Sequence, residues 1–255
     1  MSLFKNKTAL VAATEFVIIV AGVLVALAAD AAVDARRERA LELGYLVALR
    51  DDVRSDLASF DEQWFPGAGS AVTGNARIRA VLADRVVPTD SVALLQDFIR
   101  LINYGSFDGR TSTVEDLLST GRLQLVESQE LRDAILGYHN RVEDMAEVDA
   151  AHRTQVLDAF NRHLAPVISH RVLGEGFRQR SISGFVPSYQ APDSLRHAAA
   201  RSFDGSALAD AEGVRSFLAV SSSLYGKQTT MYEALHQMAT ELERELSEAI
   251  DRLAS

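Results

Sequence analysis

The sequence has no cysteine, few prolines and few lysines. The absence of cysteine among 255 residues excludes disulfides, thiolate metal sites and cysteine nucleophiles. With only 5 prolines, long stretches of the chain are free of helix breakers, which favours long helices. Only 3 of the 26 basic residues are lysines. We interpret this preference for arginine as the coding bias of a GC-rich bacterium.

Positive charge is scarce relative to negative charge. The net formal charge is −9, and because Lys5, Lys7 and Glu15 give the first 29 residues +1, the remaining chain carries −10. A general nucleic-acid binder needs a basic face that replaces the counterions of the phosphates. The acidic balance therefore argues against nucleic acid as a partner. It also leaves no polybasic surface for anionic lipids.

Sequence patterns of common active sites are missing too. We find no phosphate-binding loop, no dinucleotide fingerprint and no nucleophile elbow in the sequence. Sustained alternation of apolar and polar residues, which is typical of strands, is also absent. We therefore expect a helical protein that is not an enzyme and needs no cofactor.

The longest apolar stretch covers residues 10–29. Among these twenty residues, only Glu15 is charged and only Thr14 is otherwise polar. A transmembrane helix needs about 20 such residues. The uninterrupted part, residues 16–29, is shorter and overlaps the range of a buried helix or a signal peptide. The lysines before it and a passable cleavage site at Ala26-Leu27-Ala28 would also suit a cleaved signal peptide.

Two features favour a retained anchor. Glu15 would lie inside the apolar region of a signal peptide, which rarely tolerates a charge, whereas near a membrane surface it can reach the lipid headgroups. Residues 30–64 contain no proline and only Gly44, so the helix can continue out of the bilayer. We therefore predict a transmembrane anchor at residues 1–30 and a helical soluble domain at residues 31–255.

One face of the expected anchor has a pattern. Glu15, Gly22 and Ala29 recur every seven residues, and Ala26 lies on the same side of the helix. Small residues let another transmembrane helix approach closely, and a polar residue there prefers a protein partner to lipid. We predict that this face contacts other transmembrane subunits or a second copy of the chain. The alternative is that small residues are common in any span and Glu15 is simply interfacial.

The orientation follows from the basic residues that flank the apolar stretch. A short head with two lysines usually stays in the cytoplasm, which places the body in the periplasm and the anchor in the bacterial inner membrane. Arg36, Arg37 and Arg39 follow the stretch and favour the opposite orientation. A cytoplasmic body therefore remains the alternative.

Apolar residues at spacings of three and four predict the helices of the body. They cover about 30–64, 70–84, 91–104, 112–121, 128–164, 193–203 and 209–253. Asp90 and Ser128 are predicted N-caps, Ser112 opens a capping box, and Gly121 is a predicted C-cap. A break is predicted at residues 65–69 and an irregular loop at about 166–192, because both contain proline and glycine. The predicted fold class is mainly α, with a single transmembrane helix continuing into an all-helical bundle.

Two segments resemble a family of uncharacterised bacterial single-pass membrane proteins. Glu15-Phe-Val-Ile-Ile-Val-Ala-Gly-Val-Leu-Val-Ala-Leu27 is similar to the anchor of that family: Glu, an Ile/Val run, Gly, an apolar triplet, Ala and Leu. Thr113-Val-Glu-Asp-Leu-Leu-Ser-Thr-Gly-Arg-Leu-Gln-Leu-Val126 is similar to its short helix that ends in Ser-Thr-Gly. The resemblance covers about residues 10–60 and 110–140. It implies an anchored helical protein and carries no activity.

Two pairs of residues have the spacing of metal ligands. Glu233 and His236, and likewise Asp149 and His152, lie three residues apart and so share a helix face. Di-iron bundles use Glu-x-x-His on two helices together with two further carboxylates. Here one pair contains aspartate and the other two carboxylates cannot be identified. Ordinary surface pairs or caps are therefore the simpler interpretation.

Three functions remain open from the sequence. The first is an accessory, assembly or scaffolding subunit of a larger membrane complex, acting through protein contacts. The second is a periplasmic ligand-sensing helical domain, which would need a pocket lined by residues 166–192. The third, a helical-bundle metalloenzyme, depends on the four metal-ligand candidates above.

Overall fold

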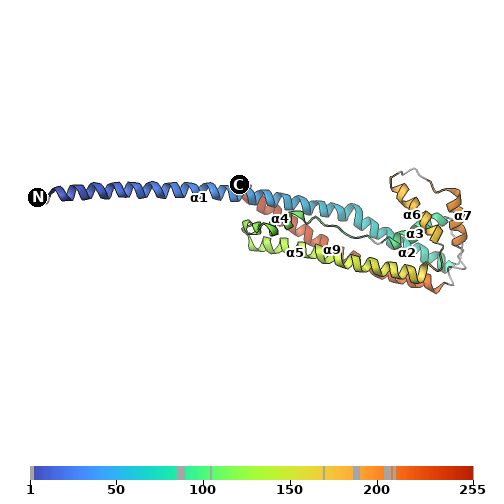
Figure 1. Ribbon diagram of the computed structural model, residues 1–255. Helices are drawn as coiled ribbons and strands as arrows, with labels where there is room; N and C mark the ends of the chain where they lie inside the picture. The colour runs from blue at the N-terminus through green and yellow to red at the C-terminus, as the bar shows by residue number, and fades with distance from the viewer. Residues whose placement is uncertain are drawn as a thin grey trace.

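The computed structural model is a helical rod (Figure 1). It describes the backbone of residues 3–84, 90–103, 105–168, 170–185, 190–203, 208 and 211–254, and their side chains except those of 3–19, 170 and 180–185. The regular elements in these ranges are all helical, without a strand among them. The prediction of a mainly α fold is therefore confirmed.

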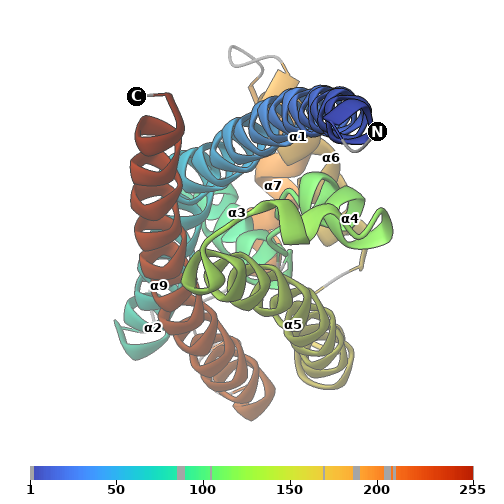
Figure 2. The ribbon, with the colours of Figure 1, turned by 90° about the vertical axis from the view of Figure 1, so that its left-hand side faces the viewer.

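Three long helices run along the rod. α1 (Leu3–Ser59) continues through η1 (Phe60–Trp64) into α2 (Phe65–Asp84), α5 (Gln129–Ala159) continues into η3 (Phe160–Leu164), and α9 is Glu212–Ala254. α9 packs against both α1 and α5. Figure 2 views the rod from its N-terminal side and shows these three helices around a common centre, with α4 (Ser112–Ser119) between α1 and α5.

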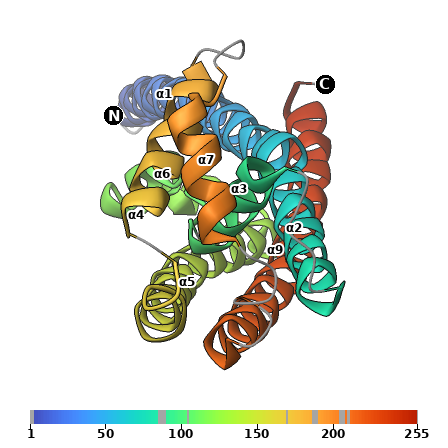
Figure 3. The same ribbon diagram turned by 90° about the vertical axis from the view of Figure 1, so that its right-hand side faces the viewer.

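Shorter helices close the two ends of the bundle. At the end far from the N-terminus, α3 (Ser91–Ile102), α6 (His170–Phe185) and α7 (Asp193–Ser202) pack on one another, and α3 packs on α2 (Figure 3). At the other end, η2 (Arg122–Leu125) lies against α1 and α4. We call these the distal and the proximal end; α1 leaves the bundle at the proximal end (Figure 1).

The core consists of two clusters of buried apolar side chains. The proximal cluster joins α1, α4, α5 and the second half of α9, and includes Leu46 and Ile135. The distal cluster joins α2, α3, α6, α7 and the first half of α9, and includes Phe98 and Phe217. Most of the apolar positions that predicted the long helices are buried in one of these clusters. Hydrophobic periodicity therefore identified the core-facing side of each helix.

The predicted break at residues 65–69 is wrong. The chain stays helical from α1 into α2 through the π-turn η1, in which the N–H of Phe65 donates to the carbonyl of Phe60, five residues earlier. The next residue, Pro66, has no N–H, and its ring would crowd a carbonyl of an ordinary α-helical turn. The wider π-turn before the proline lets the helix continue with a local deformation.

The same arrangement ends α5. In η3, the N–H of Ala165 donates to the carbonyl of Phe160 at 2.9 Å, and Pro166 follows. Here residues 165–167 form a turn and not a further helix, so this proline does mark the end of the long helix, as predicted.

The predicted irregular loop at 166–192 is wrong in its middle, because α6 covers His170–Phe185. The region contains Gly174 and Gly176, which we read as loop residues. A Cβ on Gly176 would lie 2.4 Å from Cδ1 of Ile99 and 2.8 Å from Cδ2 of Leu95. This glycine therefore allows α6 to approach α3 closely. Residues 186–189, also in the expected loop, lie outside the described residues.

Capping residues predicted helix ends more reliably than proline and glycine predicted breaks. Asp90 accepts hydrogen bonds from two backbone N–H groups at the start of α3, and Ser128 accepts one at the start of α5. Gly121 follows α4 with a φ of 68°, in the left-handed region that favours glycine. One cap differs: the N-cap of α4 is Thr111, one residue before the predicted Ser112.

Among the described residues, no helix is both long enough and apolar enough to cross a membrane. The structure therefore does not show the predicted transmembrane helix. Of residues 10–29, on which that prediction rests, the side chains of 10–19 lie outside the described part of the chain.

Candidate functional site

The N-terminal part of α1 leaves the bundle as a single helix (Figure 1). Every residue from 20 to 41 is exposed. Among them, Val23 is 54%, Leu24 61% and Val25 70% exposed. Consecutive helical residues point about 100° apart, so these three side chains place apolar surface around most of the helix. A helix that is apolar on all sides is typical of a protein interior or a membrane.

The predicted interaction face falls partly within this segment. Gly22, Ala26 and Ala29 are exposed. Apart from the helix's own backbone, no described atom lies within 4 Å of a Cβ built on Gly22. The side chain of Glu15, the fourth predicted residue, lies outside the described part of the chain. The three described residues of this face are thus accessible to a partner.

A charged section of α1 separates the apolar segment from the bundle. We call residues 30–41 the stalk; it contains Asp30, Asp34, Arg36, Arg37, Glu38 and Arg39. Nη1 of Arg37 lies 3.5 Å from Oδ1 of Asp34, and both side chains are largely exposed. Such exposed ion pairs contribute little to stability. At 1.5 Å per residue the stalk is about 18 Å long, and it continues without a break into the bundle.

Asp149, one of the four metal-ligand candidates, is buried in the bundle and fully hydrogen-bonded. Its carboxylate is 0% exposed and accepts hydrogen bonds from the hydroxyl of Tyr232, from Nε2 of Gln228 at 3.1 Å and from the N–H of Phe107 at 3.1 Å. Its neighbour His152 is also buried, and desolvation lowers the pKa of its imidazole. The geometry of Asp149 is that of a structural carboxylate.

The second candidate pair, Glu233 and His236, lies on α9 and faces α2. The ring of His236 packs edge-on against Phe60 and Phe65, and its Nε2 is 3.4 Å from Oδ1 of Asp61. Glu233 lines a shallow hollow beside it. Within the described residues, no three His, Asp or Glu side chains gather in a group that could hold a metal ion. The four candidates are therefore not brought together in a metal site.

A polar layer lies between the two hydrophobic clusters. It consists of Asp149, Gln228, Tyr232 and the backbone of Gly105 and Phe107. Nε2 of Gln228 donates to the carbonyl of Gly105 at 2.8 Å, and the N–H of Phe107 donates to the hydroxyl of Tyr232 at 2.8 Å. Sequence reasoning missed this layer. The available signal was the pair Gln228 and Tyr232, one turn apart on the core face of α9.

A second buried carboxylate holds the other end of the same connecting segment. Asp56 on α1 is 2% exposed and accepts hydrogen bonds from the hydroxyl of Tyr138 at 2.8 Å and the N–H of Arg110 at 3.1 Å. Burial raises the pKa of Asp56 to about 6, although both hydrogen bonds lower it. Residues 105–111, between α3 and α4, are thus fixed to the long helices by Asp149 and Asp56.

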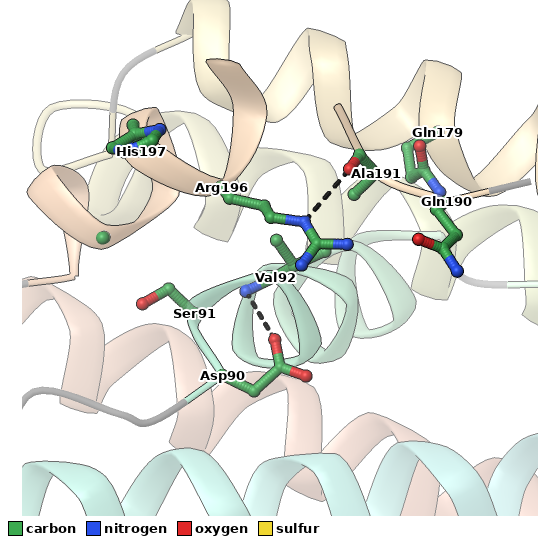
Figure 4. Close-up of a pocket in the computed structure, with 9 residues that line it drawn as sticks. Asp90, Ser91, Val92, Gln179, Gln190, Ala191, Arg196 and His197 are labelled. Atoms are coloured by element: carbon green, nitrogen blue, oxygen red, sulfur yellow. Dashed lines mark hydrogen bonds between the residues drawn. The ribbon is translucent and has the colours of Figure 1, made fainter. Parts of the chain in front are cut away.

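A pocket of about 690 Å³ opens at the distal end, between the start of α3, α6 and α7 (Figure 4). Its polar lining is formed by Asp90, Ser91, Gln179, Gln190, Arg196 and His197. Gln179 and Gln190 belong to the range 166–192, which was expected to be an irregular loop and which the ligand-sensing alternative would need as a pocket lining. The structure thus places a pocket there, with α6 as one wall.

Comparisons with protein families, curated proteins and solved structures found no match for this chain. Its function must therefore be argued from its own residues.

Proposed function

We propose that this chain is a single-pass membrane protein whose helical bundle acts through protein contacts, as an accessory or assembly subunit of a larger bacterial membrane complex. The observation that carries the proposal is the apolar surface on the projecting part of α1. This surface continues a sequence stretch, residues 10–29, that contains a single charge. Exposed apolar patches on soluble proteins are usually small, and larger ones mark membrane or protein contacts.

The shape of the molecule supports an anchor at this end. α1 is one helix from Leu3 to Ser59, so the apolar segment, the stalk and the proximal part of the bundle share one rigid element. The bundle has its own buried core, to which residues 20–41 contribute no side chain. The resemblance of residues 10–60 to an anchored family agrees with this assignment.

The small-residue face gives the proposal its second part. Gly22, Ala26 and Ala29 lie on one side of the helix, where a neighbouring transmembrane helix can approach closely. The partner is another membrane subunit or a second copy of this chain. The lysines before the apolar stretch orient the body toward the periplasm.

The test compares two identical substitutions in the full chain, Ala26→Leu and Ala21→Leu. Five residues separate these positions, which places them about 140° apart around the helix. Both variants keep the apolar character of the segment, but only Ala26→Leu adds bulk to the small-residue face. We expect the parent chain and both variants to stay in the membrane after an alkaline wash. After mild detergent extraction, Ala26→Leu should lose its partner while Ala21→Leu retains it, as judged by size and mass spectrometry.

Three results would contradict the proposal. If the mature chain begins near Ala29 and washes off the membrane, the segment is a cleaved signal peptide. If the chain is anchored but travels alone, or if Ala26→Leu and Ala21→Leu retain a partner equally, the small-residue face is not an interface.

The absence of cysteine provides a direct test of orientation. An Asp251→Cys variant carries one thiol at an exposed position of the bundle. A membrane-impermeant maleimide should label it in intact cells with a permeable outer membrane if the body is periplasmic. Labelling only after lysis would establish the cytoplasmic alternative.

A further inference from the structure

The pocket at the distal end has the size of a metabolite site. Its volume of about 690 Å³ falls within the range of about 300–1,000 Å³ common for small-ligand pockets. A smaller hollow of about 350 Å³ lies beside the polar layer, but Gln228 and Tyr232, which line it, already hydrogen-bond within that layer. The distal pocket differs because hydrogen-bonding atoms of Asp90, Gln179 and Arg196 have no partner among the residues that the structure describes.

Arg196 supplies a positive group on one wall of the pocket. Its Nε donates to the carbonyl of Ala191 at 3.1 Å, which orients the guanidinium. Oδ1 of Asp193 lies 4.0 Å from the same Nε, beyond hydrogen-bond distance. Among the described residues, no acceptor binds its terminal nitrogens, and Figure 4 shows the guanidinium extending over the start of α3. Such an edge matches the two oxygens of a carboxylate.

Asp90 supplies a negative group on the facing wall. One carboxylate oxygen accepts hydrogen bonds from the N–H groups of Val92 and Ala93, which fixes the side chain as the N-cap of α3. Its other oxygen accepts no hydrogen bond from the residues described. Because this carboxylate already sits at the helix N-terminus, a second anion is disfavoured there. Asp90 and Arg196 form no ion pair with each other, so each retains its charge for a ligand.

Gln179 adds a buried acceptor. Its side chain on α6 is 8% exposed and lines the pocket, and its Oε1 has no hydrogen-bond partner among the described atoms. A buried carbonyl without a donor is unfavourable. Because this oxygen has almost no accessible surface, a ligand with an N–H or O–H group would satisfy it after the Gln179 side chain turns into the pocket. This unpaired atom is what separates the pocket from an ordinary surface hollow.

We propose that the distal pocket binds a free amino acid whose side chain carries a hydrogen-bond donor. The ligand's carboxylate binds Arg196, its ammonium group binds Asp90, and its side-chain donor reaches Gln179. The volume accommodates such a molecule together with ordered water. This proposal stands apart from the proposed membrane anchor, which lies at the opposite end of the rod (Figure 1).

The first experiment is calorimetric titration of the full chain in detergent micelles. The probes are L-glutamine, L-serine and L-arginine as donors, L-alanine as the amino acid without a side-chain donor, and propionate as the carboxylate alone. We expect at least one of the first three to bind, with L-alanine weaker and propionate weaker by about tenfold or more. Binding of none of the five, or equal binding of propionate, would overturn the proposal.

Matched variants then locate the site. Arg196→Gln removes the cation, and Asp90→Ser removes the anion while keeping a good N-cap for α3. Each should weaken binding about tenfold or more, with the helical circular dichroism unchanged. Arg201→Gln, on the same helix but outside the pocket, is the control and should bind normally. Equal affinity in all three variants would overturn the proposal. Ala26→Leu should leave binding intact, so the two proposals fail separately.

Discussion

Three buried aspartates in this bundle differ in how far ion pairs and hydrogen bonds compensate the burial of their charge. Asp97 is 1% exposed and forms ion pairs with Arg77 and Arg100. Asp149 accepts three hydrogen bonds within the polar layer. Asp56 accepts two hydrogen bonds, but burial outweighs them and raises its pKa to about 6. Its charge at neutral pH is therefore a cost to the folded state.

The sign of this effect gives the first prediction at the residue scale. Because the folded-state pKa of Asp56 lies above its ordinary value of 3.8, the folded protein binds this proton more tightly than the unfolded chain. The resulting stability is complete below about pH 4 and is lost as the pH rises through about 6. Asp56→Asn keeps groups for both hydrogen bonds and removes the charge. At pH 7.5 it should raise the free energy of unfolding, by at most about 3 kcal/mol.

Urea denaturation at pH 4.5 and 7.5, followed by circular dichroism, checks this prediction. The gain should shrink markedly at pH 4.5, where Asp56 is protonated in the folded chain. Asp108→Asn, an exposed aspartate in the same connecting segment, is the control and should change neither value. A loss of stability in Asp56→Asn at both pH values would show that the carboxylate is needed for its hydrogen bonds.

Residue-scale predictions from sequence succeeded where the cause is local. Asp90, Ser128 and Gly121 act at helix ends, and their roles depend on residues within one turn. The surroundings of Asp149 were not predictable, because spacing along one helix does not reveal what faces it. Its partners Tyr232 and Phe107 come from segments far away in the sequence.

At the scale of the elements, the two π-turns show how a long helix accommodates a proline. Phe60 precedes Pro66 by six residues, and Phe160 precedes Pro166 by six. In both cases the carbonyl of the phenylalanine accepts a hydrogen bond from the residue just before the proline. A proline removes one helical hydrogen bond, and the π-turn spreads the disturbance over a wider turn. Sequence rules treated Pro66 and the following glycines as a break because they ignore this option.

Two glycines on α9 allow a prediction about how elements approach each other. A Cβ on Gly213 would lie 2.5 Å from the carbonyl oxygen of His163 in η3, a backbone atom that cannot move aside cheaply. Gly226 has no described atom within 4 Å of the same position. Gly213→Ala should therefore lower the free energy of unfolding by about 1–3 kcal/mol. Gly226→Ala should raise it by about 0.5–1 kcal/mol through helix propensity.

Thermal and urea denaturation of the two variants, each against the parent protein, measure this difference. The substitution is the same and both positions lie on one helix, so each variant serves as the control for the other. Equal effects of the two changes would mean that α9 and η3 do not approach as closely as the structure shows.

On the scale of the whole molecule, the polar layer joins two hydrophobic clusters placed one after the other along the rod. Tyr232→Phe removes the hydroxyl that donates to Asp149 and accepts from Phe107, leaving a buried carboxylate with fewer donors. We expect a loss of about 1–3 kcal/mol in the free energy of unfolding. Hydrogen exchange at the amide of Phe107 should also become faster.

The matched control is Tyr45→Phe, which loses an exposed hydrogen bond to Asp116 near the proximal end. It should change the free energy of unfolding by no more than about 0.5 kcal/mol. If Tyr232→Phe behaves like Tyr45→Phe in both measurements, the layer contributes nothing to the connection between the two clusters.

The all-helical class and most helix ranges were predictable because apolar residues recur at spacings of three and four within each helix segment. The division into two clusters was not, because it depends on which level of α9 meets which level of α1 and α5. The distal pocket was not predicted: the ligand-sensing alternative named residues 166–192 as a lining it would need, and much of that range is α6 and not a loop. Arg196 and Asp90, which give the pocket its charges, come from segments about one hundred residues apart.

Because α1 runs without a break into α2, the length of this helix limits how far the distal end can stand from the membrane surface. If residues 10–29 lie in the bilayer, the 55 residues from Asp30 to Asp84 extend at most about 80 Å at the rise of a helix. The amino-acid pocket near the far end is then held tens of ångströms above the lipid surface. Molecules confined to that surface would not reach it, whereas a freely diffusing solute would. The proximal end of the rod would thus meet molecules at the membrane, whereas the distal pocket would meet dissolved molecules.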